Sequence, residues 1–81
     1  MVNKAPNPDV TIDTFGLICP MPIVKTAKAI NEMEIGQVLE VIANDPGIVN
    51  DLPMWCKSTG QEFISIEEKD GEYRGMVRKL K

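Results

Sequence analysis

The sequence predicts an α+β fold, a two-layer α/β sandwich with two helices packed on one face of a four-stranded mixed sheet. Two observations predict it. Hydrophobic patterns follow one another in the order β-α-β-α-β-β, and 81 residues provide only one core. The first β-α-β unit is expected to be parallel and right-handed. We therefore expect a flexible N-terminal arm over residues 1–8 and a single domain over residues 9–81.

The first half of the chain predicts two strands around a helix. Residues 9–15 alternate between apolar and polar side chains, which indicates a short strand. Apolar residues at helical spacing over 23–30 predict a helix, with Gly36 closing the connection that follows it. Residues 38–43 are almost all apolar, which is typical of a buried strand in the centre of a sheet.

The second half begins with a turn and a further helix. Asp45 can cap a first short turn with Pro46 in its first helical position. Pro53 would cost a hydrogen bond inside one continuous helix. We therefore expect a short turn followed by a separate helix, capped by Asp51 and closed by Gly60.

The C-terminal segment predicts a hairpin. Residues 62–68 and 73–80 are the two strands, and Asp70-Gly71 is the turn between them. The first strand and the turn are rich in acids, whereas the last strand is basic. The favoured interpretation is cross-strand charge pairing on a solvated face. The alternative is a small basic strip that docks a partner.

The amino-acid composition excludes several classes of function. The net charge is −3 and the isoelectric point about 4.8, so the chain is a poor candidate for gripping nucleic acid by charge. It has no histidine, which excludes Cys-His and Ser-His pairs and histidine metal sites. Two cysteines are too few for a four-cysteine metal site, so we expect no metal and no cofactor. No apolar run suits a membrane span or a signal peptide, so we expect a cytoplasmic protein with reduced thiols.

The most unusual motif is Cys19-Pro20-Met21-Pro22. Two prolines are tolerated in the first turn of a helix, where amides have no intrahelical partner. The motif therefore places Cys19 at or near the N-cap, with the amides of Met21 and Ile23 free to face its sulfur. A helix N-terminus favours a thiolate, which predicts a pKa of roughly 7–8 for this thiol.

An accessible cysteine without a histidine suits chemistry that needs a nucleophilic sulfur and little else. Thiol exchange, or carriage of a sulfane sulfur as a persulfide, fits this description, whereas acyl transfer and proteolysis need a base. Cys56 lies on an apolar stripe with Leu52 and Trp55, which favours core packing. Two alternatives stay open. One is a thiol-redox module with a reversible Cys19–Cys56 disulfide, and the other is a protein-interaction domain that uses the exposed Met21 region or the basic last strand.

A family resemblance rests on three motifs: Asp13-x-x-Gly16-x-x-Cys19-Pro20-x-Pro22, Asn44-Asp45-Pro46 and Asp51-Leu52-Pro53-x-Trp55. The likeness covers nearly the whole domain, from about Val10 to Leu80. In this pattern the chain resembles the TusA/SirA (YhhP-like) sulfur carriers. The resemblance implies a sulfurtransferase-type relay, in which Cys19 takes a sulfane sulfur from a cysteine desulfurase, a rhodanese or a DsrE-type protein. The sulfur is held as a persulfide and handed to an acceptor protein.

The resemblance also implies roles for the neighbours of Cys19. Asp13 and Gly16 would shape the loop, and Pro20 and Pro22 would present the sulfur. Family members serve tRNA thiolation, molybdenum-cofactor synthesis or sulfur oxidation, and those of the tRNA branch commonly carry Glu where this chain has Met21. This departure favours general sulfur trafficking, linked to sulfur-compound oxidation. The acidic charge balance favours protein partners over direct contact with nucleic acid, and the lack of a long apolar run predicts no contact with a membrane.

Overall fold

The structure is a computed structural model and describes residues 7–81. The predicted N-terminal arm falls mostly on residues 1–6, which lie outside the described residues. Over 7–81 neither helix is long and apolar enough to cross a membrane. The predicted β-α-β-α-β-β order is confirmed. The elements are β1 (Val10–Asp13), α1 (Met21–Glu32), β2 (Val38–Ala43), α2 (Ile48–Thr59), β3 (Glu62–Lys69) and β4 (Glu72–Arg78).

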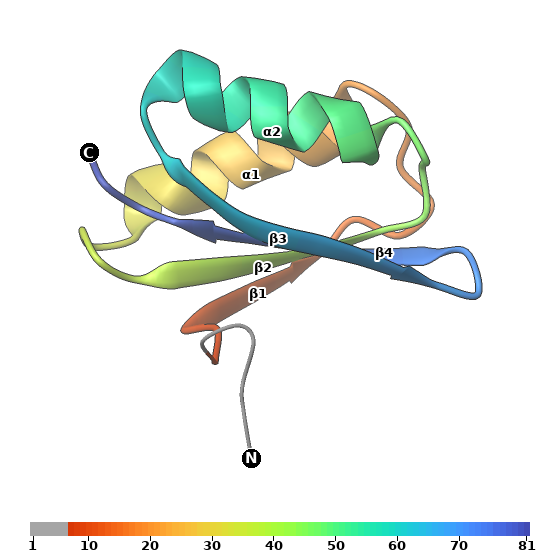
Figure 1. Cartoon of the computed structure of the whole chain (residues 1–81), viewed down its shortest axis with the longest axis horizontal. Helices are drawn as coiled ribbons and strands as arrows, with labels where there is room; N and C mark the ends of the chain where they lie inside the picture. The colour runs from red at the N-terminus through yellow and green to blue at the C-terminus, as the bar shows by residue number, and fades with distance from the viewer. Residues whose placement is uncertain (1–6) are drawn as a thin grey trace.

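The four strands form one mixed sheet in the order β1-β2-β4-β3. β1 and β2 are parallel, whereas β4 is antiparallel to both β2 and β3. Both helices lie on the same face of this sheet, and no helix of residues 7–81 lies on the other face (Figure 1). The predicted two-layer sandwich is therefore confirmed.

The core lies between the helices and the two central strands. Leu39 and Val41 of β2 are fully buried, as is Val77 of β4. Successive side chains of a strand point to opposite faces, which explains why Glu40, between the two apolar residues of β2, is only half-buried. Burying one such apolar side chain stabilises the fold by about 1.5–3 kcal/mol.

The helices close this core with side chains at helical spacing. Ile30 of α1 is buried, and α2 contributes Ile48, Leu52 and Cys56, which recur every four residues on one face. This spacing brings the whole length of α2 down onto the sheet. As a result, the first turn of α2 is held in a fixed position relative to the ends of β1 and β2.

The prediction of a separate short turn before Pro53 is wrong. α2 is one continuous helix from Ile48 to Thr59 with Pro53 inside it, and Gly47, not Asp51, stands at its N-cap. The proline removes one hydrogen bond, to the carbonyl of Val49, whose side chain is exposed. Water can serve that carbonyl, while the buried residues around the proline stabilise the helix. The predicted end at Gly60 is confirmed.

β1 is shorter than the predicted strand over residues 9–15. It ends at Asp13, because the side chain of Asp13 accepts a hydrogen bond from the amide of Phe15 at 2.9 Å and turns the chain. Thr14 is still buried, and its hydroxyl donates to the carbonyl of Ile42 at 2.6 Å. This bond ties the start of the next loop to the end of β2.

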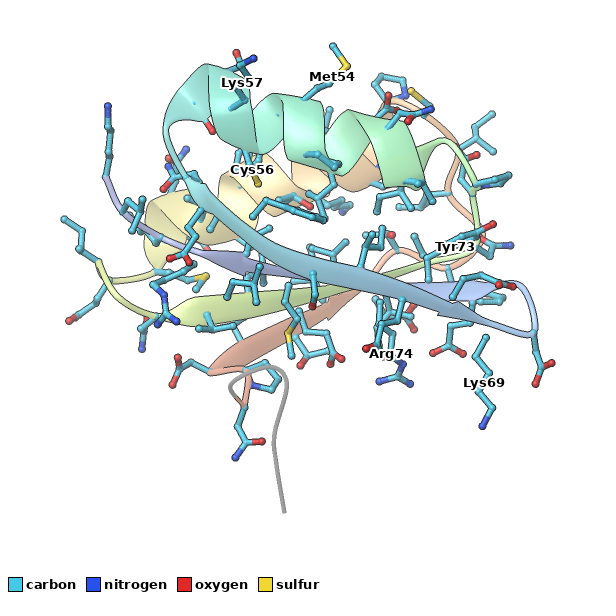
Figure 2. All side chains as sticks on the ribbon, in the orientation of Figure 1. Met54, Cys56, Lys57, Lys69, Tyr73 and Arg74 are labelled. Carbon is cyan, nitrogen blue, oxygen red and sulfur yellow. The ribbon has the colours of Figure 1, made fainter. Side chains whose placement is uncertain are left out.

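The predicted hairpin is confirmed, with Asp70 and Gly71 both at positive φ between β3 and β4. Two of its ion pairs cross strands, as the favoured interpretation expected: Arg78 contacts Glu62 of β3 at 3.1 Å, and Arg74 contacts Glu40 of β2 at 3.4 Å. A third ion pair, between Arg74 and Glu72, lies within β4. Figure 2 shows Arg74 pointing away from the helices, on the opposite face of the sheet. Exposed pairs of this kind contribute only a few tenths of a kcal/mol each, about 0.2–1.

Candidate functional site

Cys19 is exposed and lies at the end of the loop that joins β1 to α1. Pro20 is the N-cap of α1, and the helix begins at Met21 with Pro22 in its first turn. The prediction that Cys19 lies at or near the N-cap is confirmed, one residue before it. The two prolines therefore occupy positions where a helix tolerates them.

The expectation that free helix amides face the sulfur of Cys19 is wrong. The amide of Met21 donates to the carbonyl of Ile18 at 2.9 Å, and the amide of Ile23 donates to the carbonyl of Pro20 at 3.1 Å. Both amides therefore close backbone turns instead of facing the sulfur. The turn that the prolines impose uses the donors that were expected to stabilise a thiolate.

Two carboxylates flank Cys19 instead. Its amide donates to Oδ2 of Asp45 at 2.8 Å, and its Sγ donates to Oδ2 of Asp51 at 3.0 Å. Asp45 lies in the loop after β2 and Asp51 in the first turn of α2. Because β1 and β2 are parallel neighbours, the segments that follow them meet at one edge of the sheet.

These carboxylates reverse the expected electrostatics of the thiol. The hydrogen bond to Asp51 raises the pKa of Cys19 above its ordinary value, and partial desolvation and the negative charges of Asp51 and Asp45 add to this effect. The prediction of a pKa lowered to roughly 7–8 is wrong, because it considered only the local helix end. At neutral pH the sulfur therefore carries its proton.

We expect Cys19 to react more slowly with iodoacetamide at neutral pH than a cysteine in an unstructured peptide. The thiolate is the reactive form, and its fraction falls when the pKa of the thiol rises. The rate should increase with pH along a curve whose midpoint lies above that of the peptide thiol. Mass spectrometry of the Cys19 peptide over a pH series measures this midpoint. A midpoint below that of the peptide thiol would contradict the hydrogen bond between the Cys19 thiol and Asp51.

The loop before Cys19 is held by side chains from both sides. Asp13 accepts the Phe15 hydrogen bond described above, and the amide of Gly16 donates to Oδ1 of Asn44 at 2.7 Å. Gly16 has a φ of +88°, a conformation that glycine adopts without strain. The predicted roles of Asp13 and Gly16 as shapers of the loop stay predictions, and these contacts give them a physical basis.

The surroundings of the sulfur are apolar as well as acidic. A shallow depression is lined by Cys19, Pro20, Ile23, Asp51 and Met54. The side chain of Met54 is 69% exposed, and Ile18 and Met21 are also exposed beside the motif. Such a rim of exposed apolar side chains around a reactive atom is typical of a surface that meets other proteins.

A larger hollow of about 660 Å³ lies elsewhere, along the β3–β4 hairpin. Its lining consists of Phe15, Glu67, Glu68, Lys69, Asp70, Glu72 and Arg74. None of these side chains is a cysteine, so the hollow offers no sulfur atom for a transfer step, and most of its charges are paired or face solvent. We therefore place the candidate site at the smaller depression.

Cys56 belongs to the core, as predicted. Its side chain is 1% exposed and points from α2 toward the sheet (Figure 2). Burial raises the pKa of this thiol to about 11. Trp55 beside it is half-buried and packs against the core, which confirms its expected role as a packing residue. A buried sulfur cannot be reached by another protein, so the exposed Cys19 is the cysteine suited to transfer chemistry.

The site also contains residues whose part sequence reasoning missed. The sequence pattern predicts Asp45 and Asp51 only as caps and gives Asn44 only as part of the family motif, yet all three reach the Cys19 loop. One signal could have found Asn44 and Asp45: polar residues that directly follow a strand parallel to β1 lie at the edge where the β1 loop emerges.

Comparisons with known proteins show what the whole chain is similar to. The family described as Sulfurtransferase TusA matches residues 10–79. The sulfur carrier protein TusA of Allochromatium vinosum is 42% identical over 71 residues, which cover 88% of this chain and 93% of that protein. YrkI of Bacillus subtilis is 55% identical over 71 residues, with 88% and 95% covered.

Further comparisons concern length and fold. A relative from Aquifex aeolicus, 41% identical over 71 residues (88% of this chain), is longer, and the chain covers 36% of it. The crystal structure of a SirA-like protein from Desulfitobacterium hafniense superposes with a TM-score of 0.78 at 27% identity, covering 89% of this chain and 99% of that one. With the family match spanning most of the domain, this chain belongs to the TusA family of sulfur carrier proteins.

Proposed function

We propose that Cys19 accepts a sulfane sulfur, holds it as a persulfide and passes it to an acceptor protein. The observation that carries this proposal is the contrast between the two cysteines. Cys19 is exposed at the tip of the Cys-Pro-x-Pro motif, whereas Cys56 is closed inside the core. A carrier needs one sulfur that donor and acceptor can both reach.

Loading exchanges one sulfur–sulfur bond for another. The Cys19 sulfur loses its proton and attacks the outer sulfur of a donor persulfide. The new bond forms as the donor's sulfur–sulfur bond breaks, and its electron pair leaves with the donor thiolate, which takes up a proton. The moved sulfur keeps its oxidation state, so the step needs no oxidant, reductant or cofactor. Unloading repeats the step with an acceptor thiolate, and Cys19 leaves as a thiol.

The partners are proteins in this proposal. A cysteine desulfurase, a rhodanese or a DsrE-type protein supplies the sulfur, and the exposed Ile18, Met21 and Met54 give such partners an apolar surface to contact. The net charge of −3 and the apolar Met21 favour sulfur trafficking between proteins, linked to sulfur-compound oxidation, over direct contact with tRNA. Reduced thiols suit the cytoplasm.

The test is to load the full chain with an inorganic polysulfide and measure its intact mass. We expect a gain equal to the mass of one sulfur atom, reversed by a reducing thiol. Peptide mapping should place the added sulfur on the peptide that contains Cys19. No gain in mass, or an added sulfur on Cys56, would overturn the proposal.

A further inference from the structure

We propose that Asp51 destabilises the Cys19 persulfide relative to the free Cys19 thiol, so that the loaded carrier passes the carried sulfur on more readily. The carboxylate does so by stabilising the empty thiol and by repelling the loaded form. This inference rests on the proposed function and adds a residue that sets the transfer equilibrium.

The first part of the argument is a hydrogen bond that only the empty carrier can make. Sγ of Cys19 donates its proton to Oδ2 of Asp51 at 3.0 Å. In the persulfide, Sγ is bonded to a second sulfur and has no proton to donate. Loading therefore breaks this bond, and unloading restores it. A hydrogen bond to a charged acceptor is among the stronger ones, so its loss weighs against the loaded state.

The second part is charge. The outer sulfur of a persulfide ionises more readily than a thiol, so the loaded carrier brings a negative charge to this site. The ionisable groups that face it are Asp51 from α2 and Asp45 from the loop after β2. Among residues 7–81, the lining of the depression includes no lysine or arginine that would offset them. Like charges at close range repel, and this repulsion again disfavours the loaded form.

Both effects have the same sign, and the exposed position of Cys19 moderates both because water screens them. For the exchange between a small persulfide and the carrier, we expect Asp51 to lower the equilibrium constant of loading by about three- to tenfold. A lower constant means that a larger share of the sulfur passes on when an acceptor thiol is present.

The experiment measures loading at equilibrium. The full chain is incubated without oxygen in mixtures of glutathione persulfide and glutathione at a series of ratios, and intact mass gives the loaded fraction. Asp51→Asn removes the charge and keeps the shape of the side chain. In this variant, half of the protein should be loaded at a ratio of glutathione persulfide to glutathione about three- to tenfold lower than in the wild type. Asp70→Asn is the matched control, because Asp70 is exposed in the hairpin turn, and its midpoint should equal that of the wild type.

The possible outcomes separate the inference from the proposed function. If the wild type gains no sulfur on Cys19, both are overturned. If the wild type loads and Asp51→Asn has the same midpoint, or a higher one, only the role of Asp51 is overturned. Circular dichroism checks the fold of each variant, and Asp51→Ser, which also removes the charge and suits the start of a helix, replaces the Asn variant if that one does not fold.

Discussion

Replacing Cys19 by alanine is expected to abolish sulfur loading completely. The substitution removes the atom that forms the new sulfur–sulfur bond, and Cys56 cannot replace it because its side chain is 1% exposed. The fold should be unaffected, since the Cys19 side chain is exposed and its amide still donates to Asp45. The measurement is the intact mass after incubation with polysulfide, together with a circular dichroism spectrum.

Cys56→Ala is the matched control for this prediction. It removes the other cysteine and leaves the exposed sulfur in place, so the variant should gain one sulfur atom as the wild type does. The same pair of variants tests the redox alternative, in which both cysteines would be needed for a reversible disulfide. Persistence of the adduct in Cys19→Ala, or its loss in Cys56→Ala, would show that the assignment of Cys19 is incorrect.

The largest effect on stability is expected at the contact between α2 and β4. Leu52 is fully buried and lies directly over Gly75, where there is no room for a further side-chain atom. Leu52→Ala should lower the free energy of unfolding by about 2–5 kcal/mol. A domain of this size has a total of about 4–12 kcal/mol, at roughly 0.05–0.15 kcal/mol per residue. Urea unfolding followed by circular dichroism measures the change.

The close packing of Leu52 against Gly75, which is the reason for this loss of stability, can be tested with a second substitution at the same contact. Gly75→Ala adds a methyl group that would overlap the Leu52 side chain, at a cost of about 1–3 kcal/mol. In the double variant that methyl group enters the space that Leu52 has vacated. The combined loss should therefore be smaller than the sum of the single losses by about 0.5–3 kcal/mol. Simple additivity would show that the two residues are not packed as described.

Patterns within one element predicted most of the fold. The apolar run of β2 and the Asp70-Gly71 turn identify their structures because burial and backbone conformation act on neighbouring residues. Pro53 was misinterpreted because its local cost was considered without the burial of Leu52 next to it, which the sheet supplies. β1 was predicted too long because the side chain of Asp13 ends it, a contact that periodicity does not register.

The candidate site was predictable only in part, because one of its residues lies in a local motif and another reaches it from a distant part of the sequence. Cys19 stands out because the prolines around it are unusual at any position other than a helix start. Asp51 is 32 residues away in the sequence, and only the parallel pairing of β1 and β2 brings its helix to the Cys19 loop. The expected pKa of Cys19 was too low for this reason, because the main cause that raises it is the hydrogen bond to this distant carboxylate.

The distance between these two residues along the chain has a consequence during synthesis. A ribosome adds about 5–20 residues per second, so the 32 residues from Cys19 to Asp51 take about 2–6 seconds. The contact between them forms only later still, because α2 docks on a sheet whose strand β4 is made after α2. We therefore expect the Cys19 thiol of a chain that has not yet folded to react faster with alkylating agents than the same thiol in the folded domain.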